Sequence, residues 1–451
     1  MISGSQIGRH NTTATPSPLR TENGGRLGVG LGVAVSHLPS ALSHVWLVRL
    51  LVLAALVLCM SAPEELFYSQ TESELNPFAG TVKLVLLGLG SAILLLCRSR
   101  KRHWAIAGPF VSLMGWATIC WVASGAEMLP AKNLVSSFGG ILVLAAFCAA
   151  AEYIGGVGRL IPLLAWALTA AILMSILFGM LGFQPLPGES RLPGELEWFH
   201  GVGLPWYAVA GCAALIAWVL ALYLTRPGVW LEPAILLLLA IPALTFLRAF
   251  LIGIVVSIVF AAIVSMWNAR RRSGHFQQPY AKRYKRSLLL ATVTLAIGAV
   301  IFFMKTGIRQ EGNELSGREI IWPIEMVSVI QHPIFGLGPF GDIDLLRFKE
   351  DLPQVGAAHS DYLGAAVCYG IPGLALFVGA LFVTWRRIVR FVPLSAEERA
   401  CRYAALFSLV GVSTTMIAEN VIRDPRLFSL HLLFPALCLS AAGLHRKKAP
   451  V

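Results

Sequence analysis

Charged residues are scarce in this chain of 451 residues: only 13% are Asp, Glu, Lys or Arg, whereas 56% are hydrophobic. An ordinary soluble domain has about 25% charged residues. Apolar runs of 17 residues or more recur along the whole length, and each is long enough to cross a hydrocarbon core of about 30 Å as a helix. The composition excludes a soluble protein and predicts an all-α, polytopic membrane protein. Helices are expected rather than strands, because the runs are continuously apolar and do not alternate.

The chain also lacks a C-x-x-C pair, and its eight cysteines lie in or at the edges of apolar runs. This placement argues against a disulfide framework and against a zinc site, and it predicts small core residues. No cleavable signal peptide is evident at the start. Residues 1–44 are polar or glycine-rich with one short apolar run, so we interpret them as a disordered cytoplasmic tail.

About twelve apolar segments are long enough to be spanning helices, and the charges between them set the predicted topology. With the N-terminus inside, cytoplasmic segments hold 24 Lys and Arg residues and extracytoplasmic segments hold 10, as the positive-inside rule requires. The formal net charge of +12 is therefore expected to come from cytoplasmic basic residues that set the topology and contact anionic lipid. It does not indicate nucleic-acid binding. The spans are expected near residues 45–62, 79–97, 104–123, 134–153, 160–183, 202–224, 230–246, 249–267, 288–304, 363–384, 403–422 and 428–444.

This threading divides the chain into four parts. Residues 1–44 are the tail, residues 45–304 hold helices one to nine, and residues 363–451 hold helices ten to twelve with a cytoplasmic C-terminus. Between them, residues 305–362 form much the longest loop, which is extracytoplasmic and links helices nine and ten. Because long loops in compact proteins are usually functional, this loop is the first place to look for a site.

The long loop carries a pattern typical of an amphipathic helix. Four apolar residues recur at helical spacing beside three polar ones, so we expect a helix that lies in the membrane interface. Pro323 should kink this helix or restart it. The apolar positions are Ile320, Ile324, Val327 and Ile330, and the polar ones are Glu319, Glu325 and Gln331.

Four basic residues near span ends all fall on the extracytoplasmic face, although other charges set the topology. They are Arg191, Arg248, Arg318 and His359. Arg248 has apolar neighbours on both sides, and an arginine at mid-span costs at least ~2.5–3.5 kcal/mol. One interpretation is a hairpin-tip arginine whose side chain reaches lipid phosphate. The other is an anion site facing a cavity, because the planar guanidinium binds phosphate through two parallel bonds.

Two further motifs lie in the long loop. The glycines of "GLGPFG", Gly336 and Gly338 among them, permit a tight turn and close approach to a ligand, although most such runs merely join helices. A D-x-D pair, Asp342 and Asp344, holds a divalent metal in many nucleotide-sugar transferases. Nucleotide sugars are cytoplasmic and this loop is predicted to lie outside, so we expect no metal here.

His359 precedes Ser360, which is a good N-cap residue for the tenth span. The positive end of a helix dipole opposes protonation of a nearby histidine, and a general base has to be neutral. The alternative is a histidine that only bonds backbone at the junction of loop and helix.

The ordered set of motifs resembles the bacterial O-antigen ligase and O-antigen polymerase superfamily. An upstream arginine element of that family is similar to Arg191–Gly194, and its arginine between two spans is similar to Arg248. The C-terminal signature of the family is similar to Gly317-Arg318, Ile321-Trp322, His332-Pro333, Phe335-Gly336, Gly338, His359, and Gly370 with Gly373.

The resemblance implies a multispan glycosyltransferase of the bacterial inner membrane, with its active site on the periplasmic face. The donor would be a glycan on undecaprenyl pyrophosphate, and the acceptor a sugar hydroxyl on lipid A core or on a growing polysaccharide. His359, Arg318 and Arg248 would be catalytic, while Arg191, Gly336 and Gly338 would help to bind substrate. The reaction would need no metal and no cofactor, because arginines stabilise the departing pyrophosphate and a neutral histidine accepts the hydroxyl proton.

Two other functions stay open on the sequence alone. A lipid-linked oligosaccharide flippase would place charges along a path through the membrane and show repeated halves. A peptidoglycan polymerase of the shape-and-division type would depend on an outer-loop aspartate, Asp342, Asp344 or Asp361. The sequence does not distinguish ligase from polymerase, and it does not name the sugar, the linkage, the acceptor or the oligomeric state.

Overall fold

The computed structural model describes residues 38–61, 77–126, 128–180, 205–225, 248–272, 318–339, 341, 360–422 and 424–445, with short helical pieces at 234–235, 238–239, 289 and 293. The chain divides into two compact units, Met1–His44 and Val45–Val451. The second unit contains most of α1 and every later helix. The predicted tail, residues 1–44, lies almost entirely outside the described residues.

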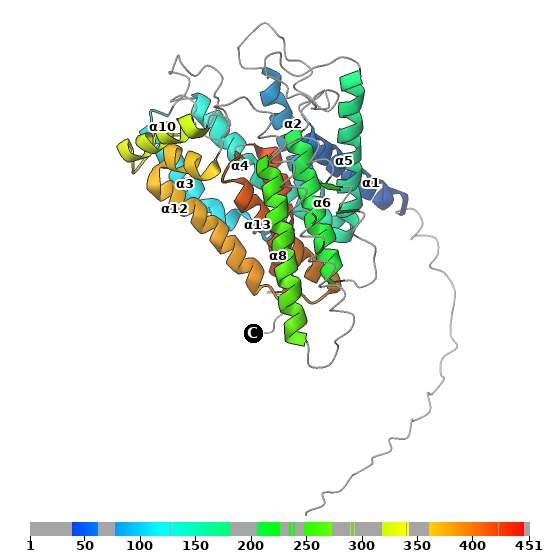
Figure 1. Cartoon of the computed structure of the whole chain (residues 1–451). Coiled ribbons are helices and arrows are strands. Elements are labelled where there is room, and N and C mark those ends of the chain that lie inside the picture. The colour runs from blue at the N-terminus through cyan, green and yellow to red at the C-terminus, as the bar shows by residue number, and fades with distance from the viewer. Residues whose placement is uncertain are drawn as a thin grey trace, which may run out of the picture. The chain divides into compact units, whose positions relative to one another are not determined.

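The described residues form helices and no strands, as predicted (Figure 1). All eight cysteines are free thiols, and each except Cys97 is buried, which confirms their prediction as core residues. The helices are α1 (Leu38–Met60), α2 (Pro77–Leu96), the 3-10 turn η2 (Lys101–Trp104), α3 (Ala107–Ala123), α4 (Met128–Tyr153), α5 (Val157–Met180), α6 (Pro205–Thr225), α8 (Arg248–Arg272), α10 (Arg318–Gln331), α12 (Asp361–Arg390), α13 (Ala396–Thr415), α14 (Pro425–His431) and α15 (Leu433–His445).

Three of these helices are long and apolar enough to cross a membrane, and α14 with α15 makes a fourth if the bent pair is one span. The three are Val157–Met174, Tyr207–Thr225 and Asp361–Arg390. Shorter apolar helices of 10–17 residues occur in α1, α2, α3, α4, α8 and α10. The chain is therefore a helical membrane protein. The number twelve stays a prediction, since the spans expected at 230–246 and 288–304 lie largely outside the described residues.

Local capping sets the ends of the C-terminal helices. Ser360 caps α12 as predicted, because its hydroxyl accepts the Leu363 N–H at 3.3 Å. Ser395 and Glu398 form a capping box at the start of α13. This box corrects the span expected at 403–422: the helix begins seven residues earlier and ends at Thr415, and residues 416–422 form a turn.

The expected span 428–444 is also corrected, because it is two helices bent by 59°. Pro435 explains the break, since a proline ring clashes with the carbonyl four residues earlier and donates no N–H to it. That carbonyl belongs to His431, and it accepts a hydrogen bond from the Ser408 hydroxyl on α13 instead. The break therefore leaves this buried carbonyl with a hydrogen-bond partner.

Helix α13 runs through the middle of the second unit, between α12 and α8 (Figure 1). Small residues allow α13 and α8 to approach closely: a Cβ added at Gly253 of α8 would lie 2.7 Å from the Gly411 carbonyl oxygen. Close contact of this kind is typical of helix pairs in membranes. On its other sides α13 packs against α6 and α15.

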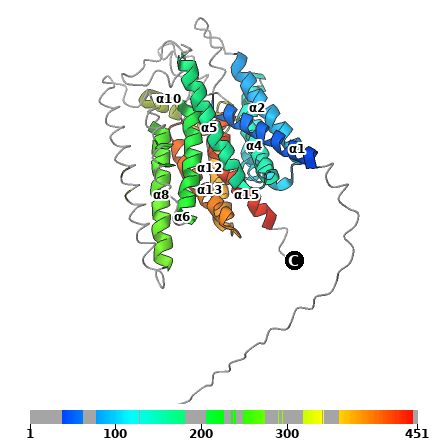
Figure 2. The same cartoon turned by 90° about the vertical axis from the view of Figure 1, so that its right-hand side faces the viewer.

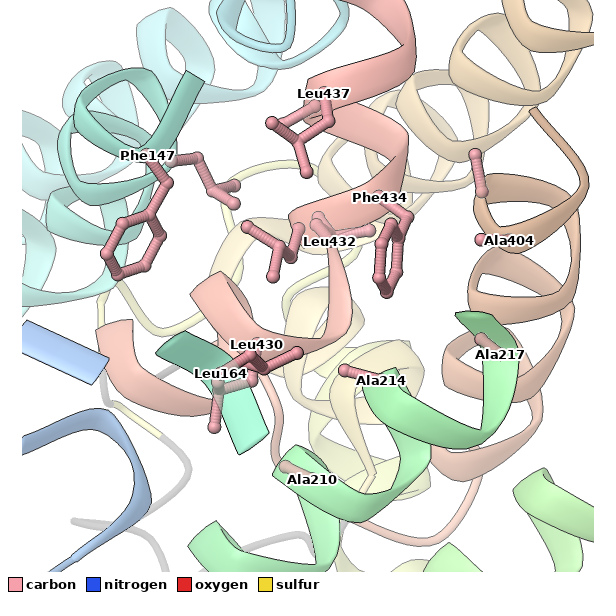
Figure 3. Packing of buried hydrophobic residues seen from close by; sticks show 14 of the residues in the cluster. Phe147, Leu164, Ala210, Ala214, Ala217, Ala404, Leu430, Leu432, Phe434 and Leu437 are labelled. Atoms are coloured by element: carbon pink, nitrogen blue, oxygen red, sulfur yellow. The ribbon is translucent and has the colours of Figure 1, made fainter. Parts of the chain in front are cut away.

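The bend between α14 and α15 fills the core beside α13. In Figure 3, Leu430, Leu432 and Phe434 of the bend point among α4, α6 and α13. Alanines of α6 leave room for them, namely Ala210, Ala214 and Ala217. Trp218 of α6 stacks on Phe434 with ring centroids 5.6 Å apart. The core is thus built from large residues on the bend and small ones on α6.

Helix α10 lies across the direction of α6 and α8 in both views (Figures 1 and 2). The helix that the loop sequence predicted is therefore present, although it continues through Pro323 without restarting. Its apolar residues Met326, Val327 and Ile330 are exposed, Ile330 by 76%. Glu325 and Ser328 on the opposite face are buried against the protein. This orientation suits a helix whose apolar face meets lipid.

Candidate functional site

The turn after α10 docks on a break in α12. Gly370 interrupts α12 with φ 69° and ψ −175°, and Pro372 has no N–H to donate. Carbonyls near the break therefore lose their helical partners. The N–H of Leu337 donates to the Val367 carbonyl at 2.8 Å, and the N–H of Gly338 donates to the Cys368 carbonyl at 3.0 Å.

A tryptophan and one more backbone bond complete this contact. The indole Nε1 of Trp116 donates to the Tyr369 carbonyl at 2.8 Å, and its ring stacks on Phe335 at 5.6 Å. The N–H of Ile371 donates to the Pro333 carbonyl at 2.8 Å. These bonds satisfy backbone groups that the break in the helix would otherwise leave exposed.

Gly336 and Gly338 are needed for this docking. Both have positive φ, 65° and 87°, and a Cβ at Gly336 would lie 2.5 Å from the Val367 carbonyl oxygen. The close approach that the sequence predicted is therefore to the chain's own helix. That either glycine also contacts substrate stays a prediction.

Arg318 begins α10, and a turn after α13 holds it. Its Nη2 donates to the Ala418 carbonyl at 2.7 Å and lies 3.5 Å from Glu419 Oε1. The side chains of Arg318 and Glu419 are 16% and 19% exposed. A guanidinium that is partly exposed is suited to meet an anion.

The same turn, residues 416–422, is tied to the start of α12. The Asp361 N–H donates to the Met416 carbonyl at 3.0 Å, and the Asp361 carboxylate accepts the N–H groups of Val421 and Ile422. Arg318, Ser360 and the end of α13 therefore meet at one place. His359, which precedes Ser360 in the chain, lies outside the described residues.

The first residue of α8 is Arg248, and the packing of α8 places this end near the same turn. Gly253 follows Arg248 by five residues, or about 7.5 Å along a helix at 1.5 Å per residue. Gly253 packs against Thr415, the last residue of α13. The backbone of Arg248 is thus brought toward the turn 416–422. Arg191 lies outside the described residues.

A buried ion pair beside this region was missed by the sequence analysis. Arg426 of α14 donates through Nη2 to Asp424 Oδ2 at 2.8 Å and through Nη1 to the Ser61 carbonyl at 3.3 Å. Its guanidinium carbon lies 3.9 Å from the centre of the Tyr207 ring, and the Tyr207 hydroxyl donates to Asp424 at 3.0 Å. The Asp-Pro pair of "RDPR" was an available signal, since Asp caps a helix and Pro favours its first position.

Asp424 keeps its charge despite this burial. Burial alone would raise the pKa of the carboxyl, but the guanidinium of Arg426 and its hydrogen bonds hold the pKa below its usual range. The N–H of Arg426 also donates to Asp424 at 2.8 Å, so the carboxylate caps α14. The pair is neutral as a whole and structural in its contacts.

The opposite end of α13 carries a separate polar group. Glu152 at the end of α4 pairs with Arg102 and lies 2.8 Å from His103 Nε2. Glu397 of α13 accepts the Gly158 N–H at the start of α5 at 2.6 Å. These contacts join the end of α4 to η2 and the start of α13 to the start of α5. Which end faces the cytoplasm stays a prediction.

Among the residues that the structure describes, no group of three His, Cys, Asp or Glu side chains is arranged to hold a metal ion. Asp342 and Asp344 of the D-x-D pair lie outside them. The polar contacts described at the end of α13 are made by Arg318, Glu419, Asp361 and backbone groups.

The described helices have the length and composition of a helical membrane protein, and Arg318 lies where α10, α12 and α13 meet. Residues 203–378 match the family model described as O-antigen ligase, so this stretch is similar to that family. The resemblance seen in the motifs is thereby confirmed. The matched stretch includes Arg248, Arg318, Gly336, Gly338 and His359, whereas Arg191 precedes it. No curated protein matches the chain.

Proposed function

We propose that this protein is a glycosyltransferase of the O-antigen ligase and polymerase type. It moves a glycan from undecaprenyl pyrophosphate to a sugar hydroxyl on lipid A core or on a growing polysaccharide. The reaction takes place on the periplasmic face of the bacterial inner membrane. It uses His359 as the base and needs no metal or cofactor. The membrane lipids and the two glycan substrates are its partners.

The observation that carries this proposal is the placement of Arg318. Its guanidinium donates to the Ala418 carbonyl, and the side chain is partly exposed where the ends of α10, α12 and α13 meet. A group that leaves as pyrophosphate gains negative charge in the transition state, so a fixed cation beside it lowers the barrier. The family match over the same stretch supports this assignment.

In the proposed step, the acceptor hydroxyl attacks the anomeric carbon of the donor sugar, and the bond from that carbon to the pyrophosphate oxygen breaks. His359 takes the hydroxyl proton, and Arg318 and Arg248 balance the charge on the leaving undecaprenyl pyrophosphate. A positioned general base contributes about 10²–10⁴-fold in rate. Arg191 is a third contact to the donor, and Gly336 and Gly338 shape the substrate side of the turn.

Helix α10 fits a donor that arrives in the plane of the membrane. Its exposed apolar residues Met326, Val327 and Ile330 suit contact with lipid. Arg318 at its first turn then lies at the level of lipid phosphate groups. The donor pyrophosphate would therefore reach Arg318 without leaving the membrane surface.

A transfer assay with purified protein tests the proposal. With lipid-linked glycan and acceptor supplied, wild type should transfer glycan in the presence of a chelator. His359→Gln should lose activity by about 10²-fold or more, because glutamine keeps a hydrogen bond but accepts no proton. The matched control is His332→Gln in the same loop, which should stay active. Normal activity of His359→Gln, or loss of wild-type activity on chelation, contradicts the mechanism.

A deletion strain separates the two members of the class. Lipid-linked polymer that accumulates without attachment to lipid A core identifies a ligase. Single repeat units left unpolymerised identify a polymerase. Loss of the surface glycan together with lipid-linked repeat units trapped on the inner leaflet would indicate a flippase and contradict the proposal.

A further inference from the structure

Asp361 makes an unusual set of contacts at the start of α12. It is 5% exposed. Its Oδ2 accepts the N–H of Val421 at 2.7 Å and that of Ile422 at 3.1 Å, and its Oδ1 accepts the same Ile422 N–H at 3.2 Å. Hydrogen bonds from backbone N–H groups to a carboxylate are among the stronger ones in proteins. The side chain thus fastens the end of the turn 416–422.

The beginning of that turn is fastened to the same residue. The Asp361 N–H donates to the Met416 carbonyl at 3.0 Å, and the Ser360 hydroxyl donates to it at 3.4 Å. Asp361 therefore bridges both ends of residues 416–422 through its backbone and its side chain. The residues between, Ala418 and Glu419, are the ones that contact Arg318.

We infer that Asp361 is a positioning residue for Arg318, acting through the turn 416–422. The inference rests on the proposed function, in which Arg318 meets the donor pyrophosphate. The carboxylate fixes the backbone at Val421 and Ile422, and the Ala418 carbonyl then fixes the guanidinium. In this role Asp361 acts on Arg318 through the backbone of the turn and not on the reacting atoms.

This role differs from the one an outer-loop aspartate would have in a peptidoglycan polymerase. A catalytic carboxylate has to reach substrate, whereas Asp361 is buried and turned toward the backbone of residues 421–422. In the positioning role, loss of the carboxylate lets the turn shift and moves Arg318. A displacement of about 1 Å at a remote position can lower a rate about 10²-fold.

The test is a double-mutant cycle between Asp361→Asn and Arg318→Lys in the purified full-length protein. Asparagine has one acceptor oxygen and places an NH₂ donor against backbone donors. We expect Asp361→Asn to lower kcat/KM for the donor about 10–100-fold, with a raised KM. Because Asp361 acts through Arg318, the double variant should be within about threefold of the worse single variant, as expected for coupled residues.

Asp424→Asn is the matched control. Asp424, whose side chain is 15% exposed, is also a carboxylate at the start of a helix and also accepts a backbone N–H, but it is paired with Arg426. In the double variant, the fold-losses in kcat/KM caused by Asp424→Asn and by Arg318→Lys should multiply, because the two residues share no contact in the described structure. Where Asp361→Asn does not fold, the cycle is measured with Asp361→Glu, which keeps the charge and displaces it by one methylene.

The outcomes are distinct. Multiplied losses for Asp361 and Arg318, or an unchanged donor KM in Asp361→Asn, overturn the positioning role. An inactive wild type overturns the proposed function instead. A loss of kcat in Asp361→Asn that persists undiminished in the Arg318→Lys background identifies a direct catalytic role and also overturns the inference.

Discussion

Arg318 and Arg426 are two arginines set beside helix ends in the same part of the molecule, and they are held in different ways. Arg426 is 3% exposed and contacts Asp424, Tyr207 and the Ser61 carbonyl. Arg318 is 16% exposed, bonds the Ala418 carbonyl, and lies 3.5 Å from Glu419. The first is buried and lies 2.8 Å from its carboxylate, whereas the second is partly exposed and lies farther from the Glu419 carboxylate.

The difference separates a structural arginine from a candidate ligand-binding one. A buried guanidinium needs its own carboxylate, because removing either partner leaves an uncompensated charge. An arginine that is to meet an incoming anion has to be oriented without being fully neutralised. Membrane depth alone, which the sequence offered as the argument for Arg248, does not make this distinction.

The largest effect on stability is expected for Arg426→Ala. It leaves Asp424 buried without its cation, and breaking a buried pair costs about 3–5 kcal/mol. Thermal unfolding in detergent measures it. The double variant Asp424→Asn, Arg426→Met should recover part of the loss, because it removes both charges and asparagine keeps the helix cap. A melting temperature equal to that of wild type in Arg426→Ala would contradict the structural role of Arg426.

Gly336→Ala should be the next most damaging change. The positive φ alone costs about 1–2 kcal/mol, and the added Cβ would push the turn away from the Val367 carbonyl. Gly379→Ala is a matched control on α12 itself, where a Cβ meets nothing within 4 Å. We expect lower thermal stability for the first and a change within about 1 kcal/mol for the second. Equal stability of the two variants would contradict the docking role of the turn.

The Asp424–Arg426 pair should also make stability depend on pH. The folded-state pKa of Asp424 is lowered, so its contribution is present above the ordinary carboxyl pKa of about 4 and is lost as the pH falls below it. The melting temperature of Asp424→Asn should therefore lie below that of wild type at pH 7, and the gap should narrow toward pH 3. If the difference in melting temperature between wild type and Asp424→Asn stayed the same from pH 7 to pH 3, the charge of Asp424 would not contribute to stability.

The smallest effect is expected at Glu419, the looser counter-charge of Arg318. Ion pairs of partly exposed groups contribute about 0.2–1 kcal/mol. Glu419→Gln should therefore lower the KM for the donor by about 1.5–5-fold while kcat stays near wild type. Saturation curves with lipid-linked donor measure this. A large fall in kcat would instead assign Glu419 a part in the chemistry.

The sequence was sufficient for the class of protein and for much of the site, because both depend on local patterns. Long apolar runs predict helices, the hydroxyl of Ser360 predicts the start of α12, and the loop pattern predicts α10. Arg318 was chosen from its sidedness and from the family resemblance. The structure adds its partners, Ala418 and Glu419, which lie 100 and 101 residues further along the chain.

What the sequence analysis missed depends on distant contacts. Helix α13 ends at Thr415 and is followed by a turn that Asp361 holds through hydrogen bonds. The apolar sequence around Thr415 does not predict that the helix ends there. The break between α14 and α15 did have a local signal in Pro435, although the run around it is apolar enough to suggest one span. The sequence suggests Asp361 only as a possible catalytic carboxylate, because its backbone partners are 60 residues away.

The most direct test of the central claim compares Arg318→Ala with Arg426→Ala in the purified protein, measuring glycan transfer and thermal unfolding on the same samples. We predict that Arg318→Ala loses transfer by about 10²-fold or more while its melting temperature stays near that of wild type. Arg426→Ala should have a lower melting temperature than wild type. Its glycan transfer should fall only in proportion to the fraction of protein that is unfolded. Near-normal transfer by Arg318→Ala, in protein shown to be folded, would contradict the assignment of Arg318 to the donor pyrophosphate.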